Sequence, residues 1–312
     1  MKIVIAGGTG QIGQVLVRAW EAAGLELVIL SRAGRSSARI VSWDGRTLGP
    51  WAAELEGADV VLNLAGRSVN CRYTPANLKA MMRSRVESTR VIGAALARCE
   101  RPPAVWLQMS TATIYAHTFD APHDEATGII GGNEPDVPAY WKWSIDIARA
   151  WEHALEEAAT PHTRKVALRA AMVMSPDEGG IFDTLLRLVK FRLGGAAAGG
   201  AQYISWIHET DYVRALEFLI VRDDIDGAVN LAAPNPLPQR DFMAAIRRAA
   251  GVRVGLPATK WMLAAGAFVM RSDSELLLKS RRVIPGRLTE AGFGFDYPSW
   301  PEAAADLVRR SR

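Results

Sequence analysis

The sequence predicts an α/β protein, in which a doubly wound parallel sheet is followed by a smaller, mostly helical C-terminal lobe. The first thirty-two residues read as strand, glycine turn, helix and strand. Further apolar strands alternate with helical patterns up to about residue 174. From Ser175 onward, short helical patterns are separated by loops rich in glycine and proline. We therefore expect a sheet domain over residues 1–174, to which residues 205–231 return, and a lobe on the substrate side over residues 175–312.

Composition limits the classes of function. The chain has 312 residues, of which 49% are hydrophobic and 22% charged, so it can bury a large core. Its formal net charge of +4 is small for this length and its arginines are scattered. Nothing in this pattern marks a nucleic-acid-binding stripe. The two cysteines, Cys71 and Cys99, have no metal-ligand spacing and are expected to be ordinary thiols, so no metal site is predicted.

The N-terminus does not read as a signal peptide, although Lys2 precedes an apolar run. That run stops at a glycine after about four residues. No stretch approaches the roughly 18 apolar residues that cross a bilayer. We expect a cytoplasmic protein that does not bind membranes. A homodimer is expected only by analogy with the fold.

The glycine turn is the strongest signal in the chain. A buried strand, Lys2–Ala6, runs into Gly7-Gly8-Thr9-Gly10-Gln11-Ile12-Gly13, and a helical pattern then continues to Gly24 before a second strand. Gly7 allows the tight turn, Gly10 the close approach to a pyrophosphate, and Gly13 the packing of helix against sheet. The helix amides face the phosphate charge. Because the turn lies between a strand and a helix, it predicts dinucleotide binding rather than a bare glycine-rich turn.

The end of the second strand indicates which dinucleotide binds. NAD sites usually place an acid there for the ribose hydroxyls, whereas NADP sites have a basic residue for the 2′-phosphate. Here Ser31 and Arg32 end the strand and Arg35 follows. Arginine offers a planar fork of donors to a phosphate, although a solvated loop arginine is the alternative. The sequence therefore predicts NADP(H).

The later elements follow in order. Apolar runs predict strands over residues 39–43, 58–64, 104–109 and 164–173, and helical spacing predicts helices over residues 75–99 and around residues 145–155. Ligands bind at the carboxyl ends of such strands, where Ser110-Thr111-Ala112-Thr113 follows the fifth strand. Residues 115–138 read as a loop on the same side. Short helices are predicted over residues 240–250, 260–270 and 274–279.

These motifs together resemble the extended short-chain dehydrogenase/reductases. The resemblance rests on the glycine turn and on Asn63–Gly66, Glu87–Arg90, Ser110–Tyr115, Leu168-Arg169 and Ser205–Asp211. The chain is most similar to the atypical "epimerase family" branch, sometimes named cell-division-inhibitor-like. That branch has a C-terminal signature similar to Asn230–Pro236 and Arg282–Phe293.

The resemblance implies an NAD(P)-binding Rossmann-type fold and gives the motif residues roles. It places the following residues at the cofactor: Gly7, Thr9, Gly10, Gln11, Ile12 and Gly13 at the pyrophosphate turn, Ser31 and Arg32 at the 2′-phosphate, Asp44 near the adenine, and Leu64, Ala65 and Gly66 along the dinucleotide. Thr111 falls at the position of the hydroxyl that hydrogen-bonds the substrate carbonyl or alcohol.

The catalytic pair of that family is missing. Members that transfer hydride use a Tyr and a Lys four residues apart, so that the ammonium lowers the pKa of the phenol, which acts as general acid or base. Here Ser144 stands four residues after Tyr140, and Lys142 is two residues away, about 200° around a helix. Tyr140 and Lys142 can meet only if residues 140–143 lie outside the helix. With Thr111, they are the catalytic candidates.

Other residues have two interpretations. Tyr115 is either a substitute proton donor or, as we favour, a packed aromatic, and the Thr111 hydroxyl is alternatively satisfied by backbone. His208 is expected to cap a helix or bond in the core rather than to catalyse. Asp124 and Glu125 are expected to be solvated charges. Trp141, Trp143 and Trp206 either form an aromatic wall of a substrate pocket or, as we favour, pack in the core.

Two functions from different classes follow. The first is an NADP(H)-dependent oxidoreductase or epimerase-like enzyme acting on a small carbonyl, alcohol or sugar-like compound. The second is an NADP(H)-binding regulator or scaffold with little or no turnover, favoured by the missing Tyr/Lys pair.

Overall fold

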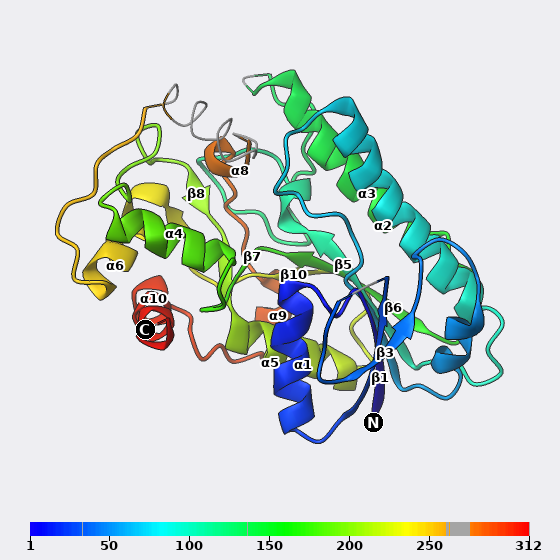
Figure 1. Ribbon diagram of the computed structural model, residues 1–312. Helices are drawn as coiled ribbons and strands as arrows, with labels where there is room; N and C mark the ends of the chain where they lie inside the picture. The colour runs from blue at the N-terminus through cyan, green and yellow to red at the C-terminus, as the bar shows by residue number, and fades with distance from the viewer. Residues whose placement is uncertain (33, 136, 260–261, 263–274, 312) are drawn as a thin grey trace.

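The computed structural model describes residues 1–32, 34–135, 137–259, 262 and 275–311. A seven-stranded parallel sheet carries helices on both faces, and a second group of helices lies to its left in Figure 1. This arrangement confirms the predicted doubly wound fold with a helical C-terminal part. The helix predicted over residues 260–270 falls, apart from Met262, outside the described residues.

Every pairing in the main sheet is parallel. Across the sheet, the strands lie in the order β10 (Gly227–Leu231), β6 (Arg164–Ala170), β5 (Val105–Thr111), β4 (Val60–Asn63), β1 (Lys2–Ala6), β2 (Glu26–Ser31) and β3 (Arg39–Ser42). The chain order reverses between β1 and β4, and crevices of this kind are where open α/β sheets bind ligands.

The described helices alternate with the strands and continue into the C-terminal part. The α-helices are α1 (Gln11–Ala22), α2 (Pro75–Leu96), α3 (Lys142–Glu156), α4 (Ile181–Lys190), α5 (Glu209–Val221), α6 (Gln239–Ala249), α8 (Glu275–Leu278), α9 (Gly286–Glu290) and α10 (Trp300–Arg310). Three 3₁₀ helices are η1 (Pro50–Leu55), η2 (Ala112–Ile114) and η3 (Ala139–Trp141). Among the described helices, none has the length and apolarity needed to cross a membrane.

Alternate residues of the strands face two separate cores. On one face, Ile3 and Ile5 pack with Leu16 and Trp20 of α1 and with Leu216 of α5. The opposite face joins the intervening strand residues to η1, α2 and α3, with members that include Val4, Ala6, Trp51, Ile92 and Leu155. Because each strand is covered on both faces, it reads as a continuous apolar run, as the sequence predicted.

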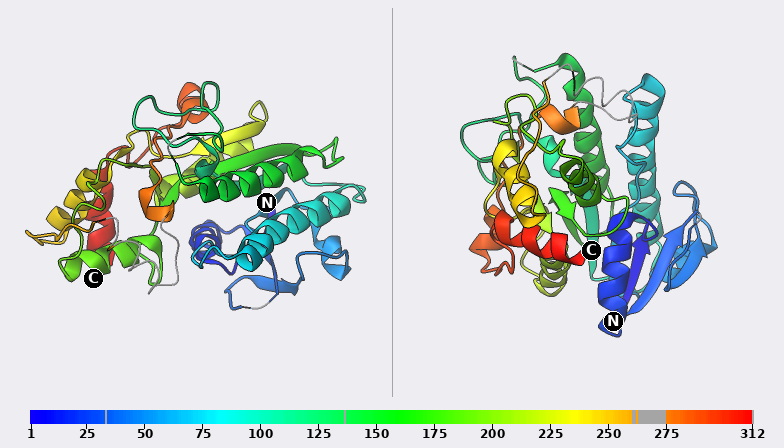
Figure 2. Two further views of the ribbon diagram at one scale, coloured as in Figure 1. Left: turned by 90° about the horizontal axis from the view of Figure 1, so that it is seen from above. Right: turned by 60° about the vertical axis from the view of Figure 1, so that its left-hand side comes forward.

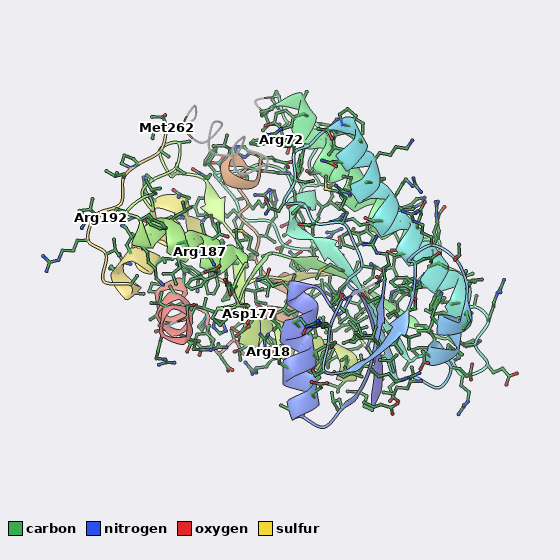
Figure 3. The ribbon with its side chains drawn as sticks, viewed as in Figure 1. Arg18, Arg72, Asp177, Arg187, Arg192 and Met262 are labelled. Atoms are coloured by element: carbon green, nitrogen blue, oxygen red, sulfur yellow. The ribbon has the colours of Figure 1, made fainter. Side chains whose placement is uncertain are left out.

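The C-terminal lobe has its own core, formed by α4, α6 and α10 around Phe242, Trp206 and Trp300. Figure 2 shows these helices beside the sheet domain. An ion pair of 2.7 Å joins Arg18 of α1 to Asp177, just before α4, and the two lie close together in Figure 3. This ion pair therefore ties the lobe to the helix that follows the glycine turn.

The strand predicted over residues 164–173 is wrong in its last three residues. The chain leaves the main sheet after Ala170, and β7 (Met172–Met174) pairs instead with β9 (Trp206–His208). The other small sheet joins β8 (Tyr203–Ile204) to β11 (Leu237–Pro238). An apolar run does not reveal which partner it pairs with, so one continuous pattern covered two strands.

Candidate functional site

The turn after β1 is built so that only glycine fits at its first position. Gly7 has a φ of +78° and its amide donates to the carbonyl of Leu30 at 2.9 Å. A Cβ on Gly7 would lie 3.0 Å from the backbone of Ala65. The left-handed backbone and the close approach together bring the end of β1 against the end of β4.

The first turn of α1 offers backbone donors at the same edge. Gly10 is the N-cap, and no side chain of a described residue caps the helix. The helix therefore leaves N–H groups for an anion, and the dipole adds to their attraction. A Cβ on Gly13 would lie 2.5 Å from the Cα of Gly8, so glycine there sets the distance between helix and turn. Ile12 packs against the core, and the exposed Gln11 extends to the turn at Gly180.

The end of β2 is tied to the glycine turn. The hydroxyls of Thr9 and Ser31 lie 2.9 Å apart, and Ser31 is buried. The next residue, Arg32, is exposed, as is Arg35. Thus Thr9 and Ser31 fix the backbone while Arg32 is left accessible beside the turn.

The remaining predicted cofactor residues also lie at carboxyl ends of strands. Leu64, Ala65 and Gly66 follow β4 and are partly or fully exposed. Asp44 follows β3, where it accepts bonds from the amides of Arg46 and Thr47 and from the hydroxyl of Thr47. The bonds from Thr47, with that of Arg46, lower the pKa of Asp44 to about 2. Asp44 thus shapes its own turn.

Asn63 is a residue whose role the motif did not reveal. It is fully buried, and its amide donates to Gln108 on β5 at 3.0 Å, while its carbonyl oxygen accepts from the amide of Ala65 at 3.0 Å. Asn63 therefore positions the backbone that faces Gly7.

Thr111, the predicted substrate-binding hydroxyl, is the last residue of β5. Its Oγ1 accepts a bond from the amide of Thr113 at 3.1 Å and so caps η2. This is the backbone-satisfied arrangement, yet the hydroxyl keeps its proton available for a second partner. The side chain is half-buried at the carboxyl edge of the sheet.

Tyr140 and Lys142 lie on either side of a helix boundary. Tyr140 is in η3, whereas Lys142 is the first residue of α3. The ammonium of Lys142 donates to both carboxylate oxygens of Asp146, at 2.5 and 2.7 Å, and Lys142 is exposed while Asp146 is half-buried. Ser144 donates instead to Glu275 of α8 at 2.6 Å. The described bonds therefore direct Lys142 along its own helix and tie Ser144 to the C-terminal segment.

Tyr115 is a packed aromatic, as favoured. It is 2% exposed and stacks on His123, with ring centroids 5.3 Å apart. Its hydroxyl donates to Asn230 and accepts from Arg169, both at 2.9 Å. Burial raises the pKa of Tyr115 and outweighs the opposing effect of Arg169. These contacts leave it poorly suited to exchange a proton with a substrate.

Arg169 is the centre of a buried polar network under the strand ends. It lies abreast of Ser110 on β5 and of Asn230 on β10. Its guanidinium forms two bonds with Glu152 of α3, at 2.9 and 2.8 Å, and Ser110 donates to the same carboxylate at 2.6 Å. Although burial opposes it, the bond to Glu152 raises the pKa of Arg169. The network therefore fixes three strands and α3 under the candidate site.

The prediction that Glu125 is solvated is wrong. Its carboxylate accepts bonds from the amides of Asn230 at 2.7 Å and Arg287 at 3.2 Å, and burial raises its pKa. Glu125 thus ties the loop after β5 to β10 and α9. Asp124 caps its own turn through the amides of Ala126 and Thr127. Sequence alone gave no sign that the loop folds over β10.

His208 and the tryptophans have mainly structural roles. His208 is the N-cap of α5, where Nδ1 accepts from the amide of Thr210, and burial lowers its pKa to about 4. Trp206 and Trp141 are buried, as predicted. Trp143, however, is 50% exposed and lines a pocket, so its assignment to the core is wrong. Cys71 and Cys99 are free thiols, as predicted.

The C-terminal segment brings basic groups to the strand ends. Lys279 is 2% exposed, and its ammonium donates to the carbonyl of Thr113 at 2.8 Å. Arg281 donates to the hydroxyl of Thr113 at 3.1 Å. Burial and the nearby Arg281 lower the pKa of Lys279 to about 8. Sequence reasoning missed both residues, because they are more than 160 positions from Thr113 and follow no motif.

Comparison with known proteins places this arrangement in a family. The model of the "NAD dependent epimerase/dehydratase family" matches residues 3–232, and that of a domain of unknown function, DUF1731, matches residues 258–307. The chain is 30% identical to "Epimerase family protein SH2119" of Staphylococcus haemolyticus, over 98% of this chain and 99% of the relative. It is 28% identical to "Epimerase family protein SA0724" of Staphylococcus aureus, over 99% of each chain.

Comparison with solved structures agrees with the match to the epimerase family. The human epimerase family protein SDR39U1, solved with NADPH, is similar with a TM-score of 0.85 and 26% identity, over 99% of both chains. A nucleoside-diphosphate sugar epimerase of Corynebacterium glutamicum has a TM-score of 0.74 at 23% identity, over 99% of this chain and 58% of that one, and shows the fold alone. The predicted resemblance to the atypical epimerase branch is confirmed.

Proposed function

Because the chain belongs to the NAD dependent epimerase/dehydratase family, we propose that it is an NADP(H)-dependent oxidoreductase of the short-chain dehydrogenase/reductase type. Its substrate would be a small carbonyl, alcohol or sugar-like compound. The observation that carries the proposal is the glycine turn, where Gly7 lies against Ala65 and the first turn of α1 presents free backbone donors. The similarity to the human protein solved with NADPH supports the same cofactor.

The preference for NADP(H) over NAD(H) is part of the proposal. It is supported by Arg32, which is exposed beside a turn held by Thr9 and Ser31. Neighbours in the fold include proteins solved with NAD, so the fold does not choose between the two cofactors. A guanidinium at the 2′-phosphate would form charge-assisted bonds that NADH does not offer.

The chemistry proposed uses Thr111 rather than a tyrosine–lysine pair. Thr111 would donate a hydrogen bond to the substrate oxygen while the cofactor supplies or accepts hydride when bound. Tyr140 stays a candidate proton donor, since it is 40% exposed in a pocket wall. The activation of its phenol would have to come from a group other than Lys142, which is paired with Asp146.

The second candidate is an NADP(H)-binding regulator with little turnover. It is favoured by one specific observation. The bonds from Lys142 to Asp146 and from Ser144 to Glu275 occupy both side chains that stand closest to the family's lysine position.

A turnover screen separates the two candidates. Purified protein would be saturated with NADPH and tested against a panel of aldehydes, ketones and keto-sugars, with absorbance at the nicotinamide band as the readout. We expect oxidation of NADPH that falls about 100-fold in Thr111→Val, as for other lost donors to a reacting oxygen. Tight NADPH binding without turnover across the panel would favour the regulator. Turnover that survives both Thr111→Val and Tyr140→Phe would contradict the assigned site.

A further inference from the structure

Arg85 of α2 is a charged group that the family motifs do not explain. Its side chain is half-buried, and this burial lowers its pKa to about 10. It lies over the ring of Trp151, 4.9 Å from the centroid, and donates to the carbonyls of Arg67 and Met81, each at 3.1 Å. Among the described residues, no carboxylate forms an ion pair with Arg85. Withdrawing a guanidinium even partly from water without a counter-ion is unfavourable, so an anion bound beside it would be stabilised.

The guanidinium lies between two parts of the candidate site. On one side, a Cβ built on Gly66 would be 3.3 Å from the Cζ of Arg85, so Arg85 reaches the predicted cofactor edge at the end of β4. On the other side, the bond to Met81 shows that the side chain folds back along α2 by one turn, toward Leu78. The guanidinium therefore faces both the strand ends and the start of α2.

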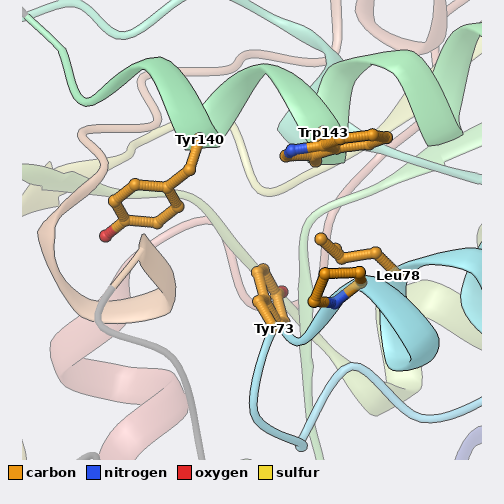
Figure 4. A pocket seen from close by; sticks show the side chains of 5 residues that line it. Tyr73, Leu78, Tyr140 and Trp143 are labelled. Carbon is orange, nitrogen blue, oxygen red and sulfur yellow. The ribbon is translucent and has the colours of Figure 1, made fainter.

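At the start of α2 there is an open pocket with aromatic walls. It has a volume of about 330 Å³ and is lined by Tyr73, Pro75 and Leu78 from α2 and the residues before it, and by Tyr140 and Trp143 facing them. Figure 4 shows Tyr140 and Trp143 above the pocket and Tyr73 and Leu78 below it. Such a volume is at the small end of ligand pockets, and aromatic walls favour a flat apolar ring.

Tyr73 links the pocket to the charge. Its ring is part of the pocket wall, and its side chain lies within electrostatic range of the guanidinium of Arg85. The side chain of Tyr73 is also within electrostatic range of Arg281. The guanidinium of Arg281 donates to the hydroxyl of Thr113, which lies two residues after Thr111. The aromatic pocket, Arg85 and the strand ends are thus neighbours around Tyr73.

We propose that Arg85 and this pocket bind the substrate of the proposed enzyme, and that the substrate carries a carboxylate or phosphate next to a flat apolar ring. This inference rests on the proposed function only in calling the bound compound a substrate. Binding of such a compound can be measured without turnover. Arg85 would hold the oxyanion by its planar fork, and Trp143 and Tyr140 would cover the ring.

The test is calorimetric titration with 2-naphthoate, 2-naphthyl phosphate and the neutral 2-naphthylmethanol, with and without saturating NADP⁺. We expect at least one of the two anions to bind about tenfold or more tightly than the neutral compound, and the tighter anion identifies the oxyanion. Arg85→Met should abolish this preference while leaving the weak binding of the alcohol. Arg85→Lys should keep part of it, and Trp143→Ala should weaken all three ligands alike.

Arg90→Met is the matched control, because Arg90 lies on the same helix with an exposed side chain 3.6 Å from Glu157. It should bind every probe as the wild type does, and thermal melts would verify that each variant is folded. Equal affinity of the wild type for both anions and the alcohol would overturn the proposal. So would a loss of NADPH affinity in Arg85→Met as large as that in Arg32→Ala, since Arg85 would then serve the cofactor. Failure of NADPH binding alone would overturn the proposed function and not this site.

Discussion

The two ends of the candidate site are built in different ways. At the cofactor end, Gly7, Gly10 and Gly13 act through backbone geometry. The contacts that require glycine, at Gly7 and Gly13, come from one short turn and from the residues just after β4. At the substrate end, Ser144, Glu275 and Lys279 act through side chains from segments more than 130 positions apart. A site formed by backbone groups can be recognised from a local sequence pattern. A site formed by side chains from distant segments is assembled by the tertiary fold.

Breaking the cofactor end should have the largest effect. In Gly13→Val, the new side chain would overlap Gly8, whose Cα is 2.5 Å from the ideal Cβ position, so helix α1 must move away from the turn. We expect NADPH affinity to fall by about 100-fold or more, because the amides lose their common direction. Fluorescence titration with NADPH checks this. Gly294→Ala, where nothing lies near the new Cβ, should bind normally. Normal affinity in Gly13→Val would refute the backbone account.

The next effect is on the scaffold below the substrate end. Glu152→Ala leaves the buried guanidinium of Arg169 and the hydroxyl of Ser110 without their shared carboxylate. Breaking a buried pair on one side costs about 3–5 kcal/mol, so urea unfolding should show a loss of that size. Glu157→Ala, on the exposed side near the end of α3, should lose less than about 1 kcal/mol. Similar losses in the two variants would mean that the network contributes little.

Lys279 gives the substrate end a pH dependence. Its pKa falls from 10.5 to about 8 on folding, through burial and Arg281, against the attraction of Glu275 and Glu134. Between these values the unfolded chain binds a proton that the folded chain has released. Stability should therefore rise from pH 8 to pH 10.5, by up to about 3 kcal/mol.

The difference in unfolding free energy between the wild type and Lys279→Met isolates this effect. We expect that difference to change by about 2–3 kcal/mol between pH 8 and pH 10.5. The exposed variant Lys190→Met should show the same pH dependence of stability as the wild type. A pH-independent difference would show that Lys279 keeps its proton when buried.

The smallest effect is expected at Lys142. Its pair with Asp146 is a largely exposed contact between residues four apart on α3, and such pairs contribute about 0.3–0.5 kcal/mol. Lys142→Met should therefore unfold close to the wild type and bind NADPH with unchanged affinity. A tenfold loss of NADPH affinity would instead show that this ammonium reaches the cofactor.

The same contrast explains what sequence could predict. Apolar strands that alternate with helices predicted the sheet, and the glycine turn predicted the edge where a ligand binds. Both signals depend on local spacing. The break after Ala170 and the burial of Glu125 were missed, because each depends on a partner strand from elsewhere in the chain. Lys279 and Arg281 were missed for the same reason.

Trp143 and Arg85 illustrate a second limit. Tryptophan is more often a core residue, so Trp143 was expected to be buried, yet it is 50% exposed and lines a pocket with residues at the start of α2. Arg85 lies on a helix whose pattern is that of an ordinary amphipathic surface. Only the approach of Gly66 and Trp151 shows that its guanidinium is covered on two sides.

The central claim is that the cofactor end holds NADP(H) through the backbone turn and Arg32. The most direct test is titration of the wild type and Arg32→Ala with NADPH and with NADH. We predict that the wild type prefers NADPH by about tenfold or more, and that Arg32→Ala loses this preference by weakening NADPH alone. Equal affinity of the wild type for the two cofactors, unchanged in Arg32→Ala, would contradict it.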